Sequence, residues 1–281
     1  MNLSMIPSLL LPAALLVAGA TAQNTRNFAT TRTQNYGVNL AGGSTTLRAT
    51  AAVTTPSTLL GATTLAATIS NTANVRLFGY SREAAAVTGT MTANHAFSSL
   101  TPSGIVFQNT STGTMTVRLG GYTVLSGASF NSQQSGNLVA NVFPGAGVSY
   151  GVNMLGIGIT VAGNVSARAN YSLTPTVSFS SGMAVDLTGP VRSSAVGSAG
   201  ASVSVLGASA GVTSTLTYAN TNGTANLHVT PDAASGTVAY TVQQIRLQLQ
   251  VFASFLGMSS TLSLFDVSTA SQSGTLNLAE I

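Results

Sequence analysis

Apolar and polar residues alternate with a period of two along most of the chain after its first 22 residues. One example is the segment in which Ile245, Leu247, Leu249 and Val251 alternate with arginine and glutamine. Such segments are rich in Val, Thr, Tyr, Phe and Leu, and clusters of Gly, Asn, Asp and Pro separate them. The pattern predicts an all-β protein whose long, bent antiparallel strands form a β-sandwich or a set of stacked β-modules.

The alternation changes phase just before this example. Tyr240 and Val242 share one parity, whereas the apolar residues from Ile245 onward share the other, so Gln243 and Gln244 insert an extra residue. Two explanations fit: a β-bulge, in which two residues face one on the neighbouring strand, or a short turn between two strands. In both, the apolar residues face the core, and the arginine and glutamines face water or a partner.

An internal repeat of about 50 residues is predicted in the C-terminal part. The segments VNMLG, VSVLG and ASFLG end at Gly156, Gly207 and Gly257, which are 51 and 50 residues apart. A glycine in the middle of a strand marks a bend or the close approach of another backbone. Together with the turn cluster FPGAG, the repeat predicts two β-rich regions, residues 23–142 and residues 143–281, the second with repeated V-x-x-L-G-type strand units.

The first 22 residues predict a signal peptide that is cleaved after Ala22. Their apolar run is interrupted by Pro7 and Pro12 and is followed by small residues that fit a cleavage site before Gln23. A short transmembrane anchor is the alternative, which the short, interrupted run disfavours, and no later segment has the roughly 20 apolar residues of a membrane-spanning helix. We therefore expect a secreted protein, located outside the cell or at its surface, without disulfides because cysteine is absent.

The composition favours a protein that associates with itself or binds a surface over an enzyme. Charged residues make up 5% of the chain, compared with about 25% in ordinary globular proteins. The nine basic residues are all arginine, and they form no basic cluster, which argues against nucleic-acid binding. Ser, Thr, Asn and Gln must supply the polar surface, and such a surface resists association poorly. Self-association or a surface polysaccharide is therefore the expected partner.

Four arginines are the candidate binding residues: Arg76, Arg118, Arg168 and Arg246. Each lies between apolar neighbours in a strand-like segment, as Arg48 also does, so alternation places each on a polar face. Three interpretations remain open. The face is solvated, or it is a strip that binds anions or sugars through guanidinium groups, or it is the polar lumen of an outer-membrane β-barrel. The absence of tryptophan and the scattered tyrosines and phenylalanines disfavour the barrel.

Threonines also alternate within several segments. Pairs at 90/92 and 114/116 and a triplet at 213/215/217 could line a flat hydroxyl surface of the kind that binds ice or polysaccharide. Alternating threonine is also ordinary in β-strands, because its branched side chain suits the pleated backbone.

No catalytic residue, cofactor site or metal site is predicted. The segment GASAG fits the pattern G-x-S-x-G with Ser209 as nucleophile, but no helical pattern follows it and no histidine follows His228. His228 and Asp232 could lie close across a turn, although Asp232 after Pro231 is more simply a turn residue. The other acidic residues are too isolated to form a metal site.

These observations predict an exported, non-catalytic protein of the cell surface or extracellular matrix that acts by self-assembly, adhesion or glycan binding. Its composition is similar to that of surface-layer, adhesin and fibre-forming exported proteins. An outer-membrane β-barrel that serves as a pore or anchor is the first alternative. A secreted hydrolase that uses Ser209 and His228 is the second.

Overall fold

The computed structural model describes residues 23–57, 60–129, 132–180 and 182–281. In these ranges the chain forms sixteen β-strands and no helix, which confirms the all-β prediction. The predicted signal peptide, residues 1–22, lies outside the described residues. Among the described residues there is accordingly no helix with the length and apolar character needed to cross a membrane.

The first sheet, sheet A, is antiparallel and has the strand order β16-β1-β2-β3-β4-β5-β6. Its strands are β1 (Gln23–Gly37), β2 (Ala41–Pro56), β3 (Thr63–Leu77), β4 (Tyr80–Thr101), β5 (Gly104–Leu119), β6 (Tyr122–Ser129) and β16 (Ala279–Glu280). Consecutive strands are hydrogen-bonded neighbours except for β16, through which the end of the described chain returns to pair with β1.

The second sheet, sheet B, has the order β14-β13-β11-β10-β9-β7, with β12 paired to β11 and β15, and β8 paired to β9. Its strands are β7 (Gln134–Asn141), β8 (Val148–Met154), β9 (Ile157–Ser178), β10 (Ala184–Val203), β11 (Ala208–Val229), β12 (Ala234–Val242), β13 (Arg246–Phe255), β14 (Met258–Ser268) and β15 (Gln272–Asn277). The three central strands, β9 to β11, are 20 to 22 residues long, and shorter strands lie end to end along each side of them.

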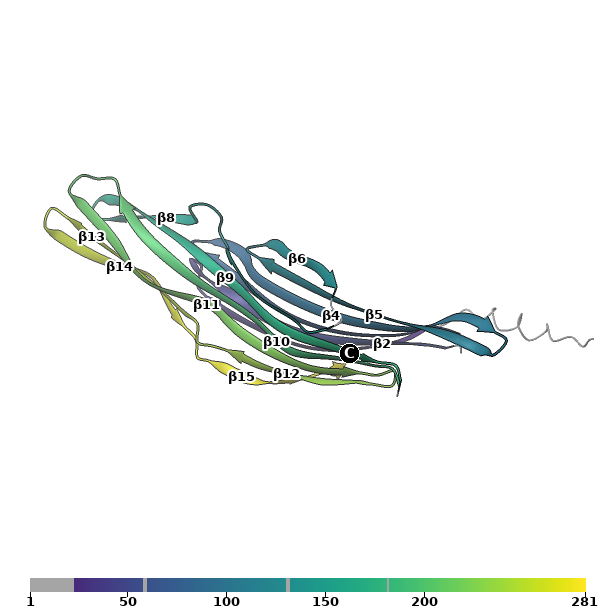
Figure 1. Ribbon diagram of the computed structural model, residues 1–281. Coiled ribbons are helices and arrows are strands. Elements are labelled where there is room, and N and C mark those ends of the chain that lie inside the picture. The colour runs from purple at the N-terminus through teal and green to yellow at the C-terminus, as the bar shows by residue number, and fades with distance from the viewer. Residues whose placement is uncertain (1–22, 58–59, 130–131, 181) are drawn as a thin grey trace, which may run out of the picture.

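The two sheets stack face to face as an elongated sandwich, the first of the two predicted arrangements (Figure 1). Leu65 and Ile69 of sheet A and Leu173 and Leu187 of sheet B are fully buried in one shared core. The inner faces interlock closely: a Cβ atom at Gly89 of β4 would come within 2.3 Å of Leu173 Cδ1. Glycine at this position therefore makes room for a leucine of the opposite sheet.

The phase change near Gln243 lies beside a β-bulge between β10 and β11, but Gln243 and Gln244 insert no extra residue opposite β11, because Val242 and Arg246 pair with Thr221 and Thr217, four positions apart on both strands. Residues 243–245 join β12 to β13 without reversing the chain, since both strands pair with β11 in the same direction, so the short-turn explanation is wrong. The register between β10 and β11 shifts between Ala195 and Val196 and leaves Tyr218 of β11 as the extra residue. The apolar residues of β13 face the core, as expected, and are fully buried.

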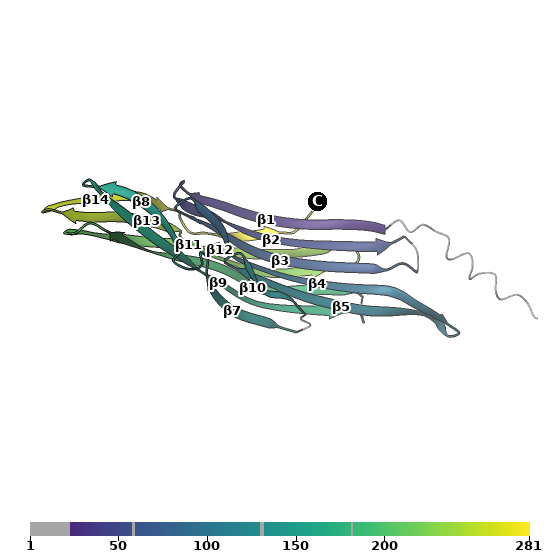
Figure 2. The ribbon, with the colours of Figure 1, turned by 90° about the horizontal axis from the view of Figure 1, so that it is seen from above.

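The repeated Leu-Gly pairs mark hairpin turns, so the expectation of mid-strand glycines is wrong at these positions. Gly156, Gly207 and Gly257 have φ angles of +78°, +78° and +80° in the β8–β9, β10–β11 and β13–β14 turns. All three turns lie at the same end of sheet B (Figure 2). The spacing of 50 and 51 residues arises because the chain runs the length of the sheet and back between successive turns.

The shared core also bears on the two predicted β-rich regions. The chain passes from sheet A to sheet B between β6 and β7, before the FPGAG cluster, so β7 of the first region belongs to the sheet that the second region builds. Residues on both sides of position 142 contribute to the same hydrophobic core. The boundary between residues 142 and 143 therefore separates neither the sheets nor the cores.

Candidate functional site

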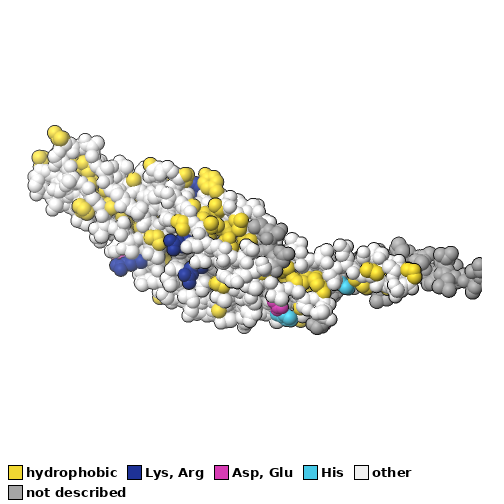
Figure 3. All heavy atoms as spheres, viewed as in Figure 1, with side chains coloured by type: hydrophobic (Ala, Val, Ile, Leu, Met, Phe, Trp, Pro, Cys, Tyr) yellow, Lys and Arg dark blue, Asp and Glu magenta, His cyan; other side chains and the backbone are white. Residues whose placement is uncertain are grey.

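The four candidate arginines do not converge on one site. Arg76 of β3 and Arg118 of β5 lie on the outer face of sheet A, whereas Arg168 of β9 and Arg246 of β13 lie on the outer face of sheet B. These faces point in opposite directions, so no single strip joins the four. Figure 3 shows a few arginines on a face that is otherwise mostly uncharged.

Their contacts also differ. Arg118 donates to Glu83 at 3.3 Å in an exposed ion pair, and Arg246 donates to the side chain of Gln248 at 3.4 Å. Arg168 has no hydrogen-bond or ion-pair partner among the described residues. Arg76 donates from Nη2 to the Val38 carbonyl oxygen at 2.6 Å, and its buried Nε has no partner within the described part of the chain. Arg76 is therefore the one of the four with a fixed position and an unused, buried donor.

A polar hollow with a volume of about 490 Å³ surrounds Arg76, and we call it the Arg76 hollow. It lies where the β1–β2 and β3–β4 hairpins end side by side in sheet A. Its lining consists of Asn35, Tyr36, Gly37, Gly43, Ser44, Asn74, Arg76 and Ser81. A Cβ atom at Gly43 would come within 2.1 Å of the Asn74 carbonyl oxygen, so close strand packing at the hollow requires glycine there.

The lining offers donors and acceptors but no carboxylate. Asn74 Nδ2 donates to Ser44 Oγ at 3.3 Å, which orients the amide beside the guanidinium of Arg76. Asn35 and Ser81 add a second amide and a second hydroxyl. A planar guanidinium flanked by amides and hydroxyls is suited to a carboxylate or other oxyanion together with neutral hydroxyl groups.

Threonines cover much of the outer face of sheet A, and we call this surface the threonine face. They are Thr25, Thr31, Thr33, Thr46, Thr50, Thr54, Thr64, Thr68, Thr72, Thr88, Thr90, Thr92, Thr110, Thr112, Thr114 and Thr116. Cross-strand hydroxyls lie within hydrogen-bond distance, for example 3.0 Å between Thr68 and Thr90. The predicted 90/92 and 114/116 pairs thus share one face, whereas the 213/215/217 triplet lies on sheet B.

The residues considered for a hydrolase are far apart. Ser209 and His228 occupy opposite ends of β11, roughly 60 Å apart at the usual rise of a strand. His228 Nδ1 instead lies 2.7 Å from Asp186 Oδ1 on β10 in an exposed pair beside a hollow of about 550 Å³. Among the described residues no side-chain hydroxyl hydrogen-bonds to this imidazole. Within the described part of the chain, this pair therefore positions no hydroxyl nucleophile.

The Asp186–His228 contact was not evident from the sequence, because it depends on the register between β10 and β11. Asp232, the predicted neighbour of His228, lies in the β11–β12 turn, which Thr230 closes through hydrogen bonds with Ala233. This position agrees with the simpler interpretation of Asp232 as a turn residue.

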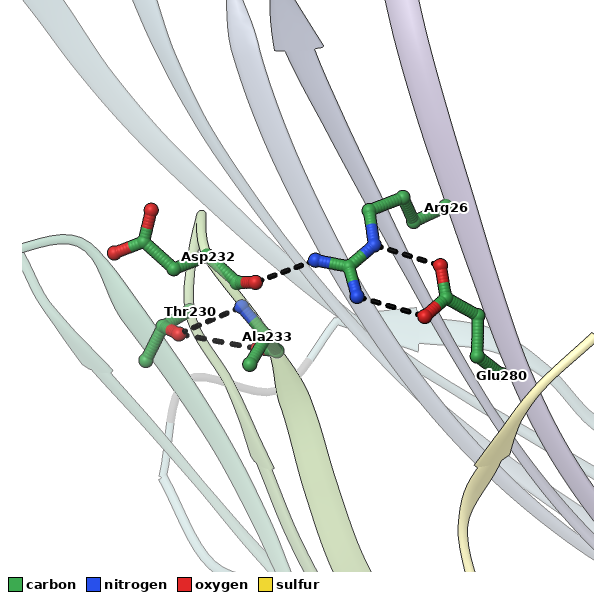
Figure 4. A network of polar contacts seen from close by, with 5 residues as sticks. All are labelled: Arg26, Thr230, Asp232, Ala233 and Glu280. Carbon is green, nitrogen blue, oxygen red and sulfur yellow. Dashed lines mark hydrogen bonds and ion pairs between the residues drawn. The ribbon is translucent and has the colours of Figure 1, made fainter.

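Arg26 connects this turn to the other sheet (Figure 4). Its guanidinium donates to both carboxylate oxygens of Glu280 at 2.7 Å and to the Asp232 carbonyl oxygen at 2.5 Å. Hydrogen bonds from Arg26 lower the pKa of Glu280, and the carboxylate in turn raises the pKa of Arg26. The network joins β1, β16 and the β11–β12 turn, so its role is to hold the two sheets together at this end.

No group of three or more His, Cys, Asp or Glu residues is arranged as metal ligands within the ranges that the structure describes. Comparison of the chain with protein-family models, with curated proteins and with solved structures found no significant match. A function can therefore be inferred from the geometry of the Arg76 hollow and the surfaces around it.

Proposed function

We propose that this protein is an exported, non-catalytic component of the cell surface or extracellular matrix that binds an acidic polysaccharide on the outer face of sheet A. The observation that carries the proposal is the Arg76 hollow. It places the guanidinium group of Arg76 beside neutral amides and hydroxyls, and no carboxylate of the described residues lines it to compete for that charge.

The chemistry of the hollow fits a sugar acid. The guanidinium of Arg76 can donate to a uronate carboxylate in the bidentate geometry that arginine favours. The amides of Asn35 and Asn74 and the hydroxyls of Ser44 and Ser81 can bond the ring hydroxyls. A volume of about 490 Å³ also lies within the range of roughly 300–1,000 Å³ that is typical of small-ligand sites.

The part of the polysaccharide that extends beyond the Arg76 hollow would lie along the threonine face. It continues along β1 to β5 from the hollow, and the Arg76 hollow opens on the same side of sheet A. Hydroxyl groups donate and accept hydrogen bonds, so they can follow a chain of sugar hydroxyls without selecting one sequence. Each contact is weak, and affinity would come from their number.

Binding measurements with a carboxylated polysaccharide test this proposal. We expect the protein to bind polygalacturonate in calorimetry and to bind neutral dextran far more weakly. Arg76→Gln should lower the affinity roughly 10- to 100-fold, because a hydrogen bond to a charged group contributes about 1.5–3 kcal/mol. Arg192→Gln is the matched control, since Arg192 lies on the outer face of sheet B.

Thermal unfolding of both variants must match that of the original protein, because Arg76 also bonds the backbone at Val38. The proposal fails if the protein binds no acidic polysaccharide. It also fails if Arg76→Gln, once shown to be folded, binds as tightly as the Arg192→Gln control.

Self-assembly is a second candidate function, which the edge strand β14 favours. Among the described strands, β14 pairs only with β13. Its 11 residues carry one charged side chain, Asp266, and one β-bulge at Leu264, but the first five, Met258 to Leu262, have no charge, proline or bulge. Proteins commonly protect such edges with charges, prolines or bulges, because an open edge can pair with another chain. Growth of the particle size with protein concentration in analytical ultracentrifugation would support this function.

A further inference from the structure

Two adjacent hairpins end in exposed apolar side chains at the far end of sheet B. Val205 and Leu206 lie in the β10–β11 turn, Leu256 lies in the β13–β14 turn, and Met258 begins β14. The two turns are neighbours, because β11 pairs with β13 up to the pair Ala208–Phe255. We call these four apolar residues the leucine tip. The hairpins that carry it extend beyond the end of sheet A (Figures 1 and 2).

The apolar side chains of the leucine tip are exposed. Leu206 is 97% exposed and Leu256 is 77% exposed, while Met258 is about half exposed. Figure 3 shows apolar side chains at this end of the molecule and no charged side chain near them. Single exposed apolar residues are ordinary, but leucines at the outermost points of two neighbouring turns form a shared apolar surface.

The backbone shows that Leu256 is unfavourable as a turn residue. Leu256 and Gly257 form a two-residue hairpin turn with φ angles of +53° and +80°. Such turns favour Asn, Asp or Gly at the first position, because a bulky side chain is strained at positive φ. Phe78 occupies the equivalent position in the β3–β4 turn with the same φ angle, but it is buried in the core. Packing compensates the strain at Phe78, and nothing in the described residues compensates it at Leu256.

The surroundings of the leucine tip carry no charge. Along β13 and β14 the nearest charged residues are Arg246 and Asp266, about 30 Å from the turn at the usual rise of a strand. The other strands that reach this end have no charged side chain in residues 133–167 and 193–227. A partner must therefore accept apolar side chains without ion pairs.

We infer that the leucine tip inserts into the interfacial region of a lipid bilayer with neutral headgroups. The two turns are convex and each presents its own leucine, which fluid acyl chains can surround separately. Beside Leu256 the β13–β14 pairing continues to Phe255–Met258. Beside Leu206, where β10 and β11 no longer pair with each other, β10 stays paired with β9 up to Val203 and β11 pairs with β13 from Ala208, so each strand keeps one hydrogen-bonded edge close to its turn during shallow insertion. This site is distinct from the Arg76 hollow, and the inference does not depend on the proposed function.

Vesicle flotation of the whole protein tests the inference. We expect binding to phosphatidylcholine vesicles that persists at high salt and is not increased by phosphatidylglycerol. The combined change Leu206→Ser and Leu256→Asn should lower the ratio of bound to free protein by at least about tenfold, since both leucines lose their apolar contact with lipid. Leu256→Asn places a favoured residue in its turn, so the melting temperature should be unchanged or higher.

The matched control is Leu100→Ser with Ile105→Ser in the β4–β5 hairpin at the other end of the molecule (Figure 1). Leu100 is 66% exposed, but the four residues of that turn carry no leucine at their outermost point. This control should float like the original protein. The inference is overturned if the original protein does not bind vesicles, if the tip variant binds as well as the control, or if binding requires anionic lipid and is lost in salt.

Discussion

The body of the sandwich and the leucine tip are built from the same kind of alternating strands, but apolar side chains are buried in the body and exposed at the tip. In the body, sheet A covers sheet B, and residues such as Ile69 and Leu173 are fully buried. At the tip, sheet A ends before the hairpins do, and Leu206 and Leu256 remain exposed (Figure 1). Alternation in sequence thus shows which side of a strand is apolar, but it does not show whether another layer covers that side.

The largest expected effect is the difference in unfolding free energy between a substitution in the core and a substitution near the tip. Ile69→Ala should lower the free energy of unfolding by about 3–5 kcal/mol, because it removes buried methyl groups and leaves a cavity between the sheets. Leu262→Ala in β14 should cost about 1 kcal/mol or less, since Leu262 is partly exposed at the edge of sheet B. Urea unfolding measures both values. Equal losses of unfolding free energy in the two variants would contradict the conclusion that sheet A covers the body of sheet B but not the region near the tip.

An intermediate effect concerns Tyr218, which is fully buried in the body and whose hydroxyl has no partner among the described residues. Burial, together with the nearby Tyr36, raises the pKa of Tyr218. Because the folded pKa lies above the usual value of about 10, this contribution to stability is complete below that pH and is lost as the pH rises through the raised pKa. The protein should therefore lose stability in alkali.

Tyr218→Phe should stabilise the protein at neutral pH by up to about 1 kcal/mol, because it removes a buried hydroxyl without a partner. It should also reduce the loss of stability between neutral and strongly alkaline solution, although burial raises the pKa of Tyr36 in the same way. Urea unfolding at both pH values provides the measurement. A variant that is less stable at neutral pH would show that the hydroxyl has a partner.

The smallest effect is local and lies in the Arg26–Glu280 pair. Hydrogen bonds from Arg26 lower the pKa of Glu280, so the stabilising contribution is present above the usual pKa of a glutamate and is lost as the pH falls through the lowered value. Below that range we expect faster amide exchange at Ile281, whose N–H donates to the Asn27 carbonyl oxygen. Glu280→Gln should show fast exchange at every pH. Slow exchange in this variant would mean that the pair does not hold β16 to β1.

Part of the fold follows from the sequence because strand periodicity is a local property. The period of two predicted the strands, the core side of Ile245 to Val251 and the polar side of the four candidate arginines. The phase change at Gln243 indicated a bulge, but the extra residue, Tyr218, lies on the neighbouring strand. A single strand does not contain the information that places an irregularity on its neighbour.

The remaining features depend on long-range register. Leu-Gly does not resemble the Asn-Gly signal of a two-residue turn, so the sequence predicts mid-strand positions for Gly156 and Gly257, whereas the structure places both in turns. The Asp186–His228 contact needs the pairing of β10 with β11. The Arg76 hollow needs two hairpins to end side by side, which no spacing along the chain indicates.

Amide hydrogen exchange of the free protein tests the contrast between body and tip most directly. Amides in the middle of β9, from Val165 to Leu173, should exchange only through global unfolding, because β9 lies between its pairing partners β7 and β10 here and its inner face is buried against sheet A. Amides that flank Leu206 and Leu256 should exchange through local opening and at least about a hundredfold faster. Equal protection in the two regions would contradict the account, because it would mean that the tip is already covered.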